Sequence, residues 1–270
     1  MTLMKELLTA TESAKRVILA NLADSAERTG TVNPYGDKTL ILDKMAEDVI
    51  IEVLESSDTP LMILSEERGL MKCRETPEYL AIIDPIDGSA NLERGIPLCS
   101  IGISVIPHSE KMTTDDVEIS IIKSIFSEET YVAEKERGVK RNNKAVSVAD
   151  YVALDQTIIS YDTKMKWDSS FTRSSVNILS AVHDMRRTAS NLLDLCWVAA
   201  GGLDAIVDLR GLLPIVHVSG THMVTEAGGY VLSDDGTRLN LPIEPSQMMS
   251  FVAASNQATA EEILNLFQTK

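Results

Sequence analysis

The sequence predicts an α/β fold built from layers of helices and sheets, and three patterns support this. Residues 3–28 carry apolar side chains at helical spacing with charges between them, which is typical of an amphipathic helix. Strand patterns follow one another from residue 99 to the segment after Gly138, which indicates an antiparallel sheet. Beyond residue 157, helix and strand patterns alternate, as they do in layered α/β proteins.

After the first helix, residues 29–37 are rich in glycine and proline, and they predict a loop. A second helix is expected from Thr39 to Glu55, with Asp43 in its first turns. A carboxylate near the amino end of a helix stabilises that helix. Asp43 therefore has a structural interpretation as well as a functional one.

Two short apolar runs, residues 61–64 and 79–83, predict strands that are each followed by carboxylates. Ligands of open α/β sheets bind beyond the carboxyl ends of strands, so Glu66 is expected to lie beside Asp84. With Asp87, three carboxylates would then repel one another within a few ångströms. A metal ion is the usual remedy, and one shared proton is the alternative.

The turn at residues 84–91, Asp-Pro-Ile-Asp-Gly-Ser-Ala-Asn, combines a cation ligand set with an anion cradle. Pro85 fixes φ and lacks an N–H group, so the chain is expected to turn there. Gly88 permits a left-handed backbone, and Ser89 is expected to cap a short helix whose first N–H groups suit a phosphate. Hard oxygen ligands beside such a cradle favour metal-assisted hydrolysis of a phosphate ester. The structural alternative is a solvated acidic turn.

The remaining elements follow from the same patterns. Strands are expected over residues 99–106, 118–126 and 131–134, with a hairpin to the segment after Gly138. A connector at residues 149–157 divides an N-terminal α+β part (1–150), which carries the carboxylates, from a C-terminal α/β part (151–270). Beyond it we expect strands over 157–161, 184–187, 205–209, 230–232 and 250–254, and helices over 169–182, 190–200, 220–227 and 261–267.

Composition excludes several classes of protein. The net charge of −15 argues against a broad basic surface for nucleic acid, although a local basic pocket for a small phosphate stays possible. No apolar run approaches the roughly 18 residues of a membrane span, and no signal peptide is expected. Cys73, Cys99 and Cys196 are odd in number and lack metal-type spacing, which predicts free thiols in a cytoplasmic protein.

Three motifs together identify a family. They are Ser-Glu-Glu at residues 65–67, the turn at 84–91, and Glu-Ala-Gly-Gly at 226–229. With them the chain resembles the inositol monophosphatase family of magnesium-dependent phosphatases over about residues 11–251. The segment 203–211 looks like archaeal-type members, which often act on both inositol phosphate and fructose 1,6-bisphosphate. The resemblance implies a layered α-β-α-β-α sandwich of the sugar-phosphatase type.

The resemblance also implies which residues hold the metal ions, Mg²⁺ or alternatively Mn²⁺. Glu66 and Asp84 would hold a first ion with the backbone carbonyl of Ile86. Asp84 would bridge to a second ion, which Asp87 would also bind. Glu67 would support the site without being a ligand.

Catalytic roles follow from the same resemblance. Asp43 and Ser89 would orient the attacking water, and family members often have Thr where this chain has Ser89. Glu66 counts as catalytic because it holds the ion that activates that water. Backbone N–H groups of Gly88 and Ser89, together with Asp87, would contact the substrate phosphate.

In the second half of the chain the resemblance implies further substrate contacts. Ser190 begins a helix, where its structural alternative is a helix cap. The family usually has Gly before this position, and this chain has Ala189. Asp208 matches an acidic position that commonly contacts substrate hydroxyls.

Basic residues near these positions are candidates for a second phosphate. Arg186 or Arg187 is placed to reach it, and Arg210 follows Asp208. The structural alternative for Arg186 and Arg187 is that one faces the core in an ion pair and the other is solvated. For Arg210 the alternative is an ordinary surface residue. Two lysines on a polar loop are weaker candidates, Lys164 and Lys166.

One departure from the family pattern concerns a third metal carboxylate. Family members have an Asp ten residues before the Glu that corresponds to Glu226, and this chain has Val216 there. The nearest side chain that binds metals is His217, and no acidic residue lies between Asp208 and Glu226. Three alternatives follow: His217 replaces the carboxylate, water fills the position, or His217 is a packed or capping residue.

The sequence therefore predicts a magnesium-dependent phosphomonoesterase, a homodimer that hydrolyses a small sugar or polyol phosphate. Inositol 1-phosphate and fructose 1,6-bisphosphate are the expected substrates, with no nucleic-acid or membrane partner. One alternative is a phosphate-binding regulatory pseudoenzyme with a defective second metal site. The other is a nucleotide phosphatase of the 3′-phosphoadenosine type.

Overall fold

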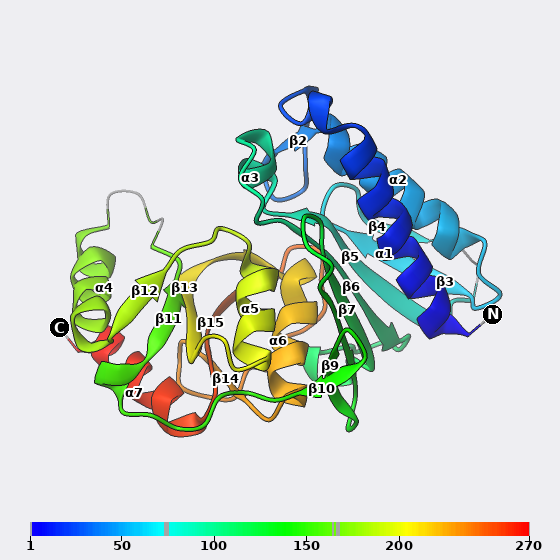
Figure 1. Cartoon of the computed structure of the whole chain (residues 1–270). Coiled ribbons are helices and arrows are strands. Elements are labelled where there is room, and N and C mark those ends of the chain that lie inside the picture. The colour runs from blue at the N-terminus through cyan, green and yellow to red at the C-terminus, as the bar shows by residue number, and fades with distance from the viewer. Residues whose placement is uncertain (1, 73–75, 164, 166–167, 270) are drawn as a thin grey trace.

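The computed structural model describes residues 2–72, 76–163, 165 and 168–269. Its helices are α1 (Leu3–Ala20), α2 (Ile41–Glu55), α3 (Ser89–Glu93), α4 (Ser169–Ala181), α5 (Asn191–Ala199), α6 (Val218–Glu226) and α7 (Gln257–Gln268). Helices α1 and α2 cover one face of a large sheet, and α5 and α6 separate it from a smaller sheet (Figure 1). Helices α4 and α7 cover the outer face of the smaller sheet. This arrangement confirms the predicted α-β-α-β-α layers.

The large sheet has eight strands, and it carries the acidic motifs. Their order is β10 (Lys144–Val146), β9 (Gly138–Arg141), β8 (Thr130–Glu134), β7 (Ile119–Ser124), β6 (Ser100–Pro107), β5 (Tyr79–Asp87), β3 (Leu61–Ser65) and β4 (Gly69–Lys72). Only β3 and β5 pair in parallel, with Ser65 beside Ile83, and the other neighbours are antiparallel. The Glu66 N–H group continues this pairing by donating to the Ile83 carbonyl at 3.1 Å. The two acidic strand ends therefore meet at one edge of the sheet, as predicted.

The smaller sheet has five strands and lies after the predicted connector. Their order is β12 (Asp184–Arg186), β11 (Ile158–Tyr161), β13 (Ala205–Pro214), β15 (Met248–Ala254) and β14 (Tyr230–Ser233). Strand β11 is parallel to both of its neighbours, and the remaining pairs are antiparallel. A separate two-stranded ribbon is formed by β1 (Arg28–Val32) and β2 (Lys38–Leu40).

Three clusters of apolar side chains among the described residues fill the space between the layers. The cluster between the sheets joins side chains such as Ile122 of β7 and Phe251 of β15 through α5 and α6. The other two lie under α1 and α2, and between the smaller sheet and helices α4 and α7. Because the middle cluster draws on both halves of the chain, the two halves share one buried interface. The division into residues 1–150 and 151–270 stays a prediction.

The first forty residues depart from the predicted elements. Helix α1 ends at Ala20 rather than near residue 28, because the Asn21 side-chain amide donates to the Val17 carbonyl at 2.8 Å. Residues 28–32 form strand β1, where a loop was expected. This prediction was wrong because β1 is largely exposed, so no alternation of apolar residues marks it.

Strand β5 is also longer than predicted. It continues past Ile83 to Asp87, and its register against β6 shifts between Asp84 and Asp87. Pro85 therefore lies in an irregular stretch of strand rather than in a turn after it. Such an irregularity re-aims side chains, and here it directs both Asp residues toward the same pocket.

Two expectations from composition can be compared with the described residues. No described helix is long and apolar enough to cross a membrane. Cys99 and Cys196 are free and buried, whereas Cys73 lies outside the described residues.

Candidate active site

The carboxyl ends of β3 and β5 meet the amino ends of α2, α5 and α6 at one pocket of about 310 Å³. The side chains predicted for metal binding and catalysis all line it: Asp43, Glu66, Asp84, Asp87, Ser89 and His217. Ile86 and Gly88 line it as well. The fold thus brings together side chains that are as far apart in the sequence as Asp43 and His217.

Asp84 is the most deeply buried carboxylate of the pocket. Its side chain is 0% exposed, and neither carboxylate oxygen has a hydrogen-bond partner among the described residues. Burial, followed by the charge of Glu66, raises the pKa of Asp84 well above its usual value. Burial also raises the pKa of Glu66 to about 7, although nearby His217 opposes this shift. Asp84 therefore needs a cation or a proton shared with Glu66, and carboxylate oxygens are ligands that hard divalent cations prefer.

Asp87 is held in place by donors from α5 and β6. Its Oδ2 atom accepts hydrogen bonds from the Ser190 hydroxyl at 2.6 Å, the Leu192 N–H at 2.8 Å and the Ser100 hydroxyl at 3.1 Å. Its Oδ1 atom accepts from the Asn191 N–H at 3.1 Å. Asp87 therefore satisfies the free N–H groups at the start of α5, and its orientation is fixed.

Ser190 is fully buried and directs its hydroxyl to Asp87. Ser190 therefore contacts Asp87, a carboxylate of the pocket, but it does not itself line the pocket. The sequence analysis did not identify the two backbone N–H donors beside it, because a backbone donor leaves no mark in the sequence. The only available signal was the predicted start of a helix at this position.

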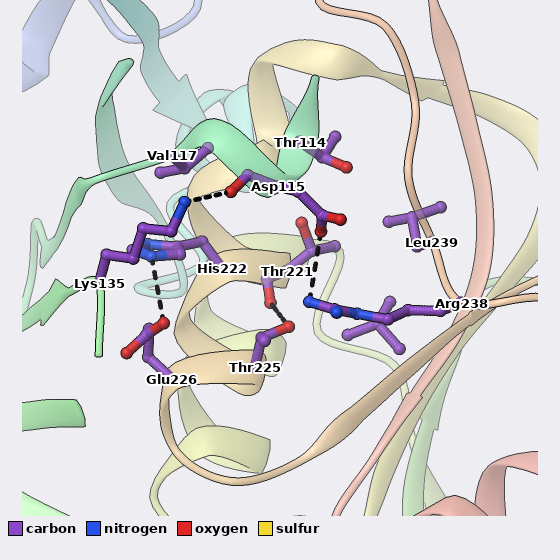
Figure 2. A pocket seen from close by; sticks show the side chains of 11 residues that line it. Thr114, Asp115, Val117, Lys135, Thr221, His222, Thr225, Glu226, Arg238 and Leu239 are labelled. Atoms are coloured by element: carbon purple, nitrogen blue, oxygen red, sulfur yellow. Dashed lines mark hydrogen bonds and ion pairs between the residues drawn. The ribbon is translucent and has the colours of Figure 1, made fainter. Parts of the chain in front are cut away.

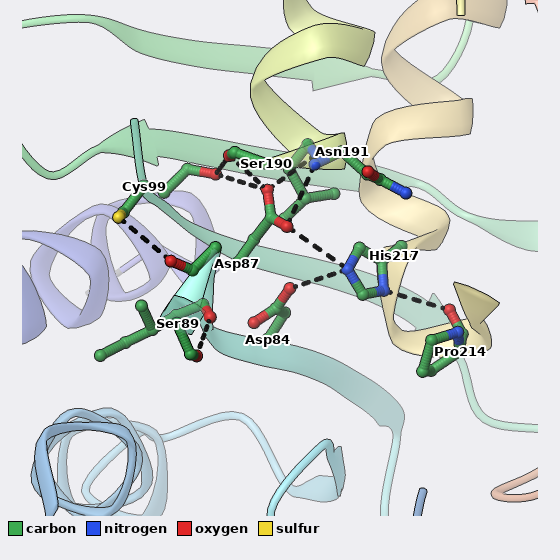
Figure 3. A network of polar contacts seen from close by, with 12 residues as sticks. Asp84, Asp87, Ser89, Cys99, Ser190, Asn191, Pro214 and His217 are labelled. Atoms are coloured by element: carbon green, nitrogen blue, oxygen red, sulfur yellow. Dashed lines mark hydrogen bonds and ion pairs between the residues drawn. The ribbon is translucent and has the colours of Figure 1, made fainter. Parts of the chain in front are cut away.

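His217 faces the two aspartates across the pocket (Figure 3). It ends a short 3₁₀ turn, Ile215–His217, that leads into α6. Its Nε2 atom lies 3.3 Å from Asp84 Oδ2 and 3.6 Å from Asp87 Oδ1, and its Nδ1 atom lies 3.3 Å from the Pro214 carbonyl. Burial alone would lower the pKa of His217, but the Asp87 carboxylate outweighs it and raises the pKa. The neighbouring side chain, Val216, is buried in the apolar cluster between the sheets.

Ser89 and Asp43 form a second polar contact at the opposite side of the pocket. The Ser89 hydroxyl lies 2.9 Å from Asp43 Oδ1 and 2.9 Å from the Ile86 carbonyl. Burial, followed by the charge of Glu67, raises the pKa of Asp43 to about 8. Gly88, with φ of +93°, precedes α3 as its N-cap, so the prediction that Ser89 is the cap was wrong. As the first residue of α3, Ser89 instead turns its hydroxyl to Asp43.

The other predicted substrate residues do not line this pocket. Asp208 is fully buried and accepts from Arg210 Nε at 2.8 Å and Nη2 at 2.6 Å. Asp162 pairs with Arg210 at 2.7 Å and with Arg187 at 2.6 Å. These two arginines therefore neutralise buried aspartates.

Arg186 is half-exposed and pairs with Asp184 on its own strand at 2.6 Å. The proposed roles of Arg186, Asp208 and Arg210 as substrate contacts stay predictions. Lys164 and Lys166 lie outside the described residues.

Two cations at the pocket rim were not predicted. Arg28 and Lys38 come from the ribbon of β1 and β2, which the sequence analysis assigned largely to a loop. Arg28 pairs with Glu93 at 2.7 Å. Glu93 and Asp37 also line the pocket, so these two cations lie among acidic side chains.

A smaller pocket of about 70 Å³ lies at the other end of α6 (Figure 2). Its cations are already paired, because Lys135 donates to the Asp115 carbonyl at 2.7 Å and Arg238 lies 3.3 Å from the Asp115 carboxylate. Burial and nearby Lys135 lower the pKa of His222 to about 4, so its ring is neutral. Glu226 adds a negative charge on the same wall. These features do not form an anion site, and the acidic pocket remains the candidate for chemistry.

A layered α-β-α-β-α fold with a carboxylate pocket at the ends of β3 and β5 defines a sugar-phosphatase type of protein. The comparisons are more specific, because the sequence profile of the inositol monophosphatase family matches residues 3–270. The chain belongs to the inositol monophosphatase family. Membership confirms the predicted enzyme class, a phosphoric monoester hydrolase of this type.

Individual relatives and solved structures carry more than one name. A protein of Methanothermobacter thermautotrophicus named fructose-1,6-bisphosphatase/inositol-1-monophosphatase is 31% identical over 243 residues, covering 86% of this chain and 84% of the relative. A Vibrio cholerae protein named Nus factor SuhB is 29% identical over 218 residues, covering 79% of this chain and 78% of the relative. The crystal structure of the MJ0109 gene product, an inositol monophosphatase-fructose 1,6 bisphosphatase, has a TM-score of 0.86 at 26% identity, covering 98% of this chain and all of that one.

Proposed function

We propose that this protein hydrolyses a small sugar or polyol phosphate with divalent cations held in the acidic pocket. The observation that carries the proposal is Asp84, a fully buried carboxylate with no hydrogen-bond partner among the described residues. Burying such a charge is costly unless a counter-charge accompanies it. Glu66 and Asp87 line the same pocket, so the missing partner is a cation.

The ligand set fits Mg²⁺, with Mn²⁺ as the alternative. Glu66, Asp84 and the carbonyl of Ile86 would hold one ion, and Asp84 with Asp87 would hold a second. Ions bound there would activate water and stabilise the leaving oxygen of a phosphate ester.

The contact between Ser89 and Asp43 supports a role in positioning water. When the Ser89 hydroxyl donates its proton to Asp43, its lone pairs are left to accept a hydrogen bond from water. The Leu40 N–H donates to the other oxygen of Asp43 at 2.9 Å and fixes this carboxylate. Backbone N–H groups of Gly88 and Ser89, which also line the pocket, would receive the phosphate.

Inositol 1-phosphate and fructose 1,6-bisphosphate are the substrates that we propose. The support is the name of the 31%-identical relative, together with two cationic side chains that line the pocket, Arg28 and Lys38. The pocket of about 310 Å³ also suits a small ester rather than a polymer.

The test is a phosphate-release screen with Mg²⁺, with Mn²⁺ and in excess chelator. Inositol 1-phosphate, fructose 1,6-bisphosphate and 3′-phosphoadenosine 5′-phosphate are the substrates to compare. We expect release from one or both of the first two, and none in chelator. Full activity in chelator would overturn the metal mechanism. Activity on the nucleotide alone would support the nucleotide-phosphatase alternative, and phosphate binding without release from any substrate would support the regulatory one.

We also propose that the protein is a cytoplasmic homodimer. Apolar side chains are unusually exposed at Val32 (60%) and Leu70 (51%), and a partner subunit would cover such surface. Light scattering on the purified protein tests the dimer, with a mass of twice 29.5 kDa expected.

A further inference from the structure

We propose that Asp84, Asp87 and His217 form a mixed nitrogen and oxygen site that selects Mn²⁺, Co²⁺ or Zn²⁺ over Mg²⁺. The proposal rests on the proposed function, because it concerns the second of the two ions proposed for this pocket, the one that Asp84 and Asp87 would share. It names a property of this chain in particular, since its relatives are expected to have a carboxylate where this chain has an imidazole.

The spacing of the three donor groups fits one ion. One ligand atom from each of Asp84, Asp87 and His217 lies within 4.8 Å of the other two. His217 Nε2 is 3.3 Å from the Asp84 oxygen and 3.6 Å from the Asp87 oxygen. Atoms about 2.1 Å from one ion, at octahedral to tetrahedral angles, are about 3.0–3.4 Å apart. Only small adjustments would therefore bring the three atoms to a common ion.

The imidazole ring is oriented for ligation. A carbonyl only accepts hydrogen bonds, so the contact of Nδ1 with the Pro214 carbonyl places the proton on Nδ1. The other ring nitrogen, Nε2, faces Asp84 and Asp87, where loss of its proton would leave a lone pair for an ion (Figure 3). Metal-binding histidines commonly donate their other ring N–H to a carbonyl in this way, which fixes the tautomer.

The surroundings of Asp84 and Asp87 also favour the binding of an ion. The two oxygens of Asp84 are buried and accept no hydrogen bond from a described donor. Asp87 is held by Ser100, Ser190 and two N–H groups of α5, which fix the direction of its lone pairs. The two carboxylates converge with the His217 ring on one point, and a cation bound there would balance their negative charges.

The donor set determines which ion is favoured. Mg²⁺ requires hard oxygen ligands in octahedral geometry, and a neutral imidazole brings one negative charge less than a carboxylate. Imidazole binds Zn²⁺ and other later first-row ions well, and affinity rises from Mn²⁺ toward Cu²⁺ for mixed ligand sets. His217 therefore weakens Mg²⁺ binding and strengthens binding of the softer ions.

Isothermal titration of the metal-free protein with Mg²⁺ and with Co²⁺ tests this selectivity, together with the visible spectrum of the Co²⁺ complex. We expect the wild type to bind Co²⁺ at least tenfold more tightly than Mg²⁺. His217→Asp should raise Mg²⁺ affinity at least tenfold and shift the Co²⁺ absorption bands, because an oxygen replaces a nitrogen ligand. His222→Asn, at the far end of α6, is the matched control and should change neither quantity.

A second variant keeps the test decisive if the added carboxylate of His217→Asp prevents folding. His217→Asn stays neutral and should lose at least tenfold in Co²⁺ affinity while Mg²⁺ affinity changes little. If both His217 variants keep the wild-type affinities and Co²⁺ spectrum, His217 is not a ligand and the inference is overturned. Hydrolysis that still depends on Mg²⁺ in that case leaves the proposed function intact, whereas a wild type that binds neither ion overturns both.

Discussion

Asp84 is the side chain of the pocket whose negative charge is hardest to bury. It is fully buried, it lies among Glu66 and Asp87, and its oxygens have no donor among the described residues. In the metal-free protein this carboxylate must take up a proton or destabilise the fold. Function and stability therefore make opposite demands on this residue, as is common at active sites.

Replacement of Asp84 by Asn should separate these two demands. The amide removes a buried negative charge, so the metal-free variant should unfold at a higher temperature than the metal-free wild type at neutral pH. Hydrolysis should fall at least about a hundredfold, because replacing a ligand costs no less than replacing a residue that supports one. Thermal melts in chelator and phosphate-release rates in Mg²⁺ are the measurements. An unchanged rate would show that Asp84 is not a ligand.

His222 provides a prediction at a residue outside the active site. Burial and Lys135 lower its pKa in the folded protein to about 4, against an ordinary value of 6.5. The unfolded chain therefore binds a proton as the pH falls through 6.5, and the folded protein does not until about pH 4. Stability should be fully present above pH 6.5 and should fall by on the order of 3 kcal/mol by pH 4.

The measurement is the free energy of unfolding of the wild type and of His222→Asn between pH 8 and pH 4. Asn keeps a partner for the Ser120 hydroxyl, which lies 2.8 Å from His222 Nδ1, but it does not titrate. The wild type should lose stability relative to the variant as the pH falls. Parallel curves for the two proteins would contradict the burial of a neutral His222.

At the scale of elements, close packing brings α5 and α6 to the site. A Cβ atom on Gly220 of α6 would lie 2.3 Å from Leu195 Cδ1 of α5, so these helices meet at a distance that only glycine permits. A Cβ atom on Gly102 of β6, which pairs with Asp84, would lie 2.5 Å from Leu192 Cδ1. Because Gly102 and Gly220 have no side chains, the amino ends of α5 and α6 can approach Asp87 and Asp84.

Gly220→Ala should therefore destabilise the protein by about 1–3 kcal/mol, the usual cost of overpacking. Gly202→Ala is the control, because its added Cβ would meet only ordinary contacts at 3.5 Å and beyond. Chemical denaturation of both variants measures the difference. Equal effects of the two substitutions would show that the contact of α5 with α6 is not tight.

The start of α5 gives a second prediction at this scale. Ser190→Ala removes the shortest hydrogen bond to Asp87, at 2.6 Å, and leaves the other three donors. Metal affinity should fall by about 10–100-fold, as it does when residues that orient ligands are replaced. Ser175→Ala is the control, because its buried hydroxyl lies 2.9 Å from Tyr161 and has no contact with the pocket residues. Comparable losses of metal affinity in both variants would indicate a general effect on folding.

In the whole molecule, periodic apolar patterns predicted most of the buried helices and strands, and the resemblance to the family predicted how they are layered. The strands that end in Glu66 and Asp84 were predicted as neighbours, and the parallel pairing of β3 with β5 confirms this. Strand β1 was missed because it is largely exposed and has no apolar alternation.

The groups that hold the site residues in position were harder to predict than the motif residues themselves. The N–H groups of Asn191 and Leu192 contact Asp87 from more than 100 positions away, and a backbone donor has no sequence signature. The direction of the His217 ring depends on the packing of α6, so the sequence alone left three alternatives for this residue. The buried pairing of Arg210 with Asp162, which lies on a different segment of the chain, likewise follows from tertiary packing rather than from a local pattern.

We expect Asp84, Asp87 and His217 to bind a divalent cation in the pocket that Glu66 also lines. Anomalous scattering from crystals soaked in Mn²⁺ would locate such an ion. We expect an anomalous peak within bonding distance of Asp84, Asp87 and His217 Nε2. A soak at saturating Mn²⁺ that gives no peak in this pocket, with the His217 ring turned away from the aspartates, would contradict it.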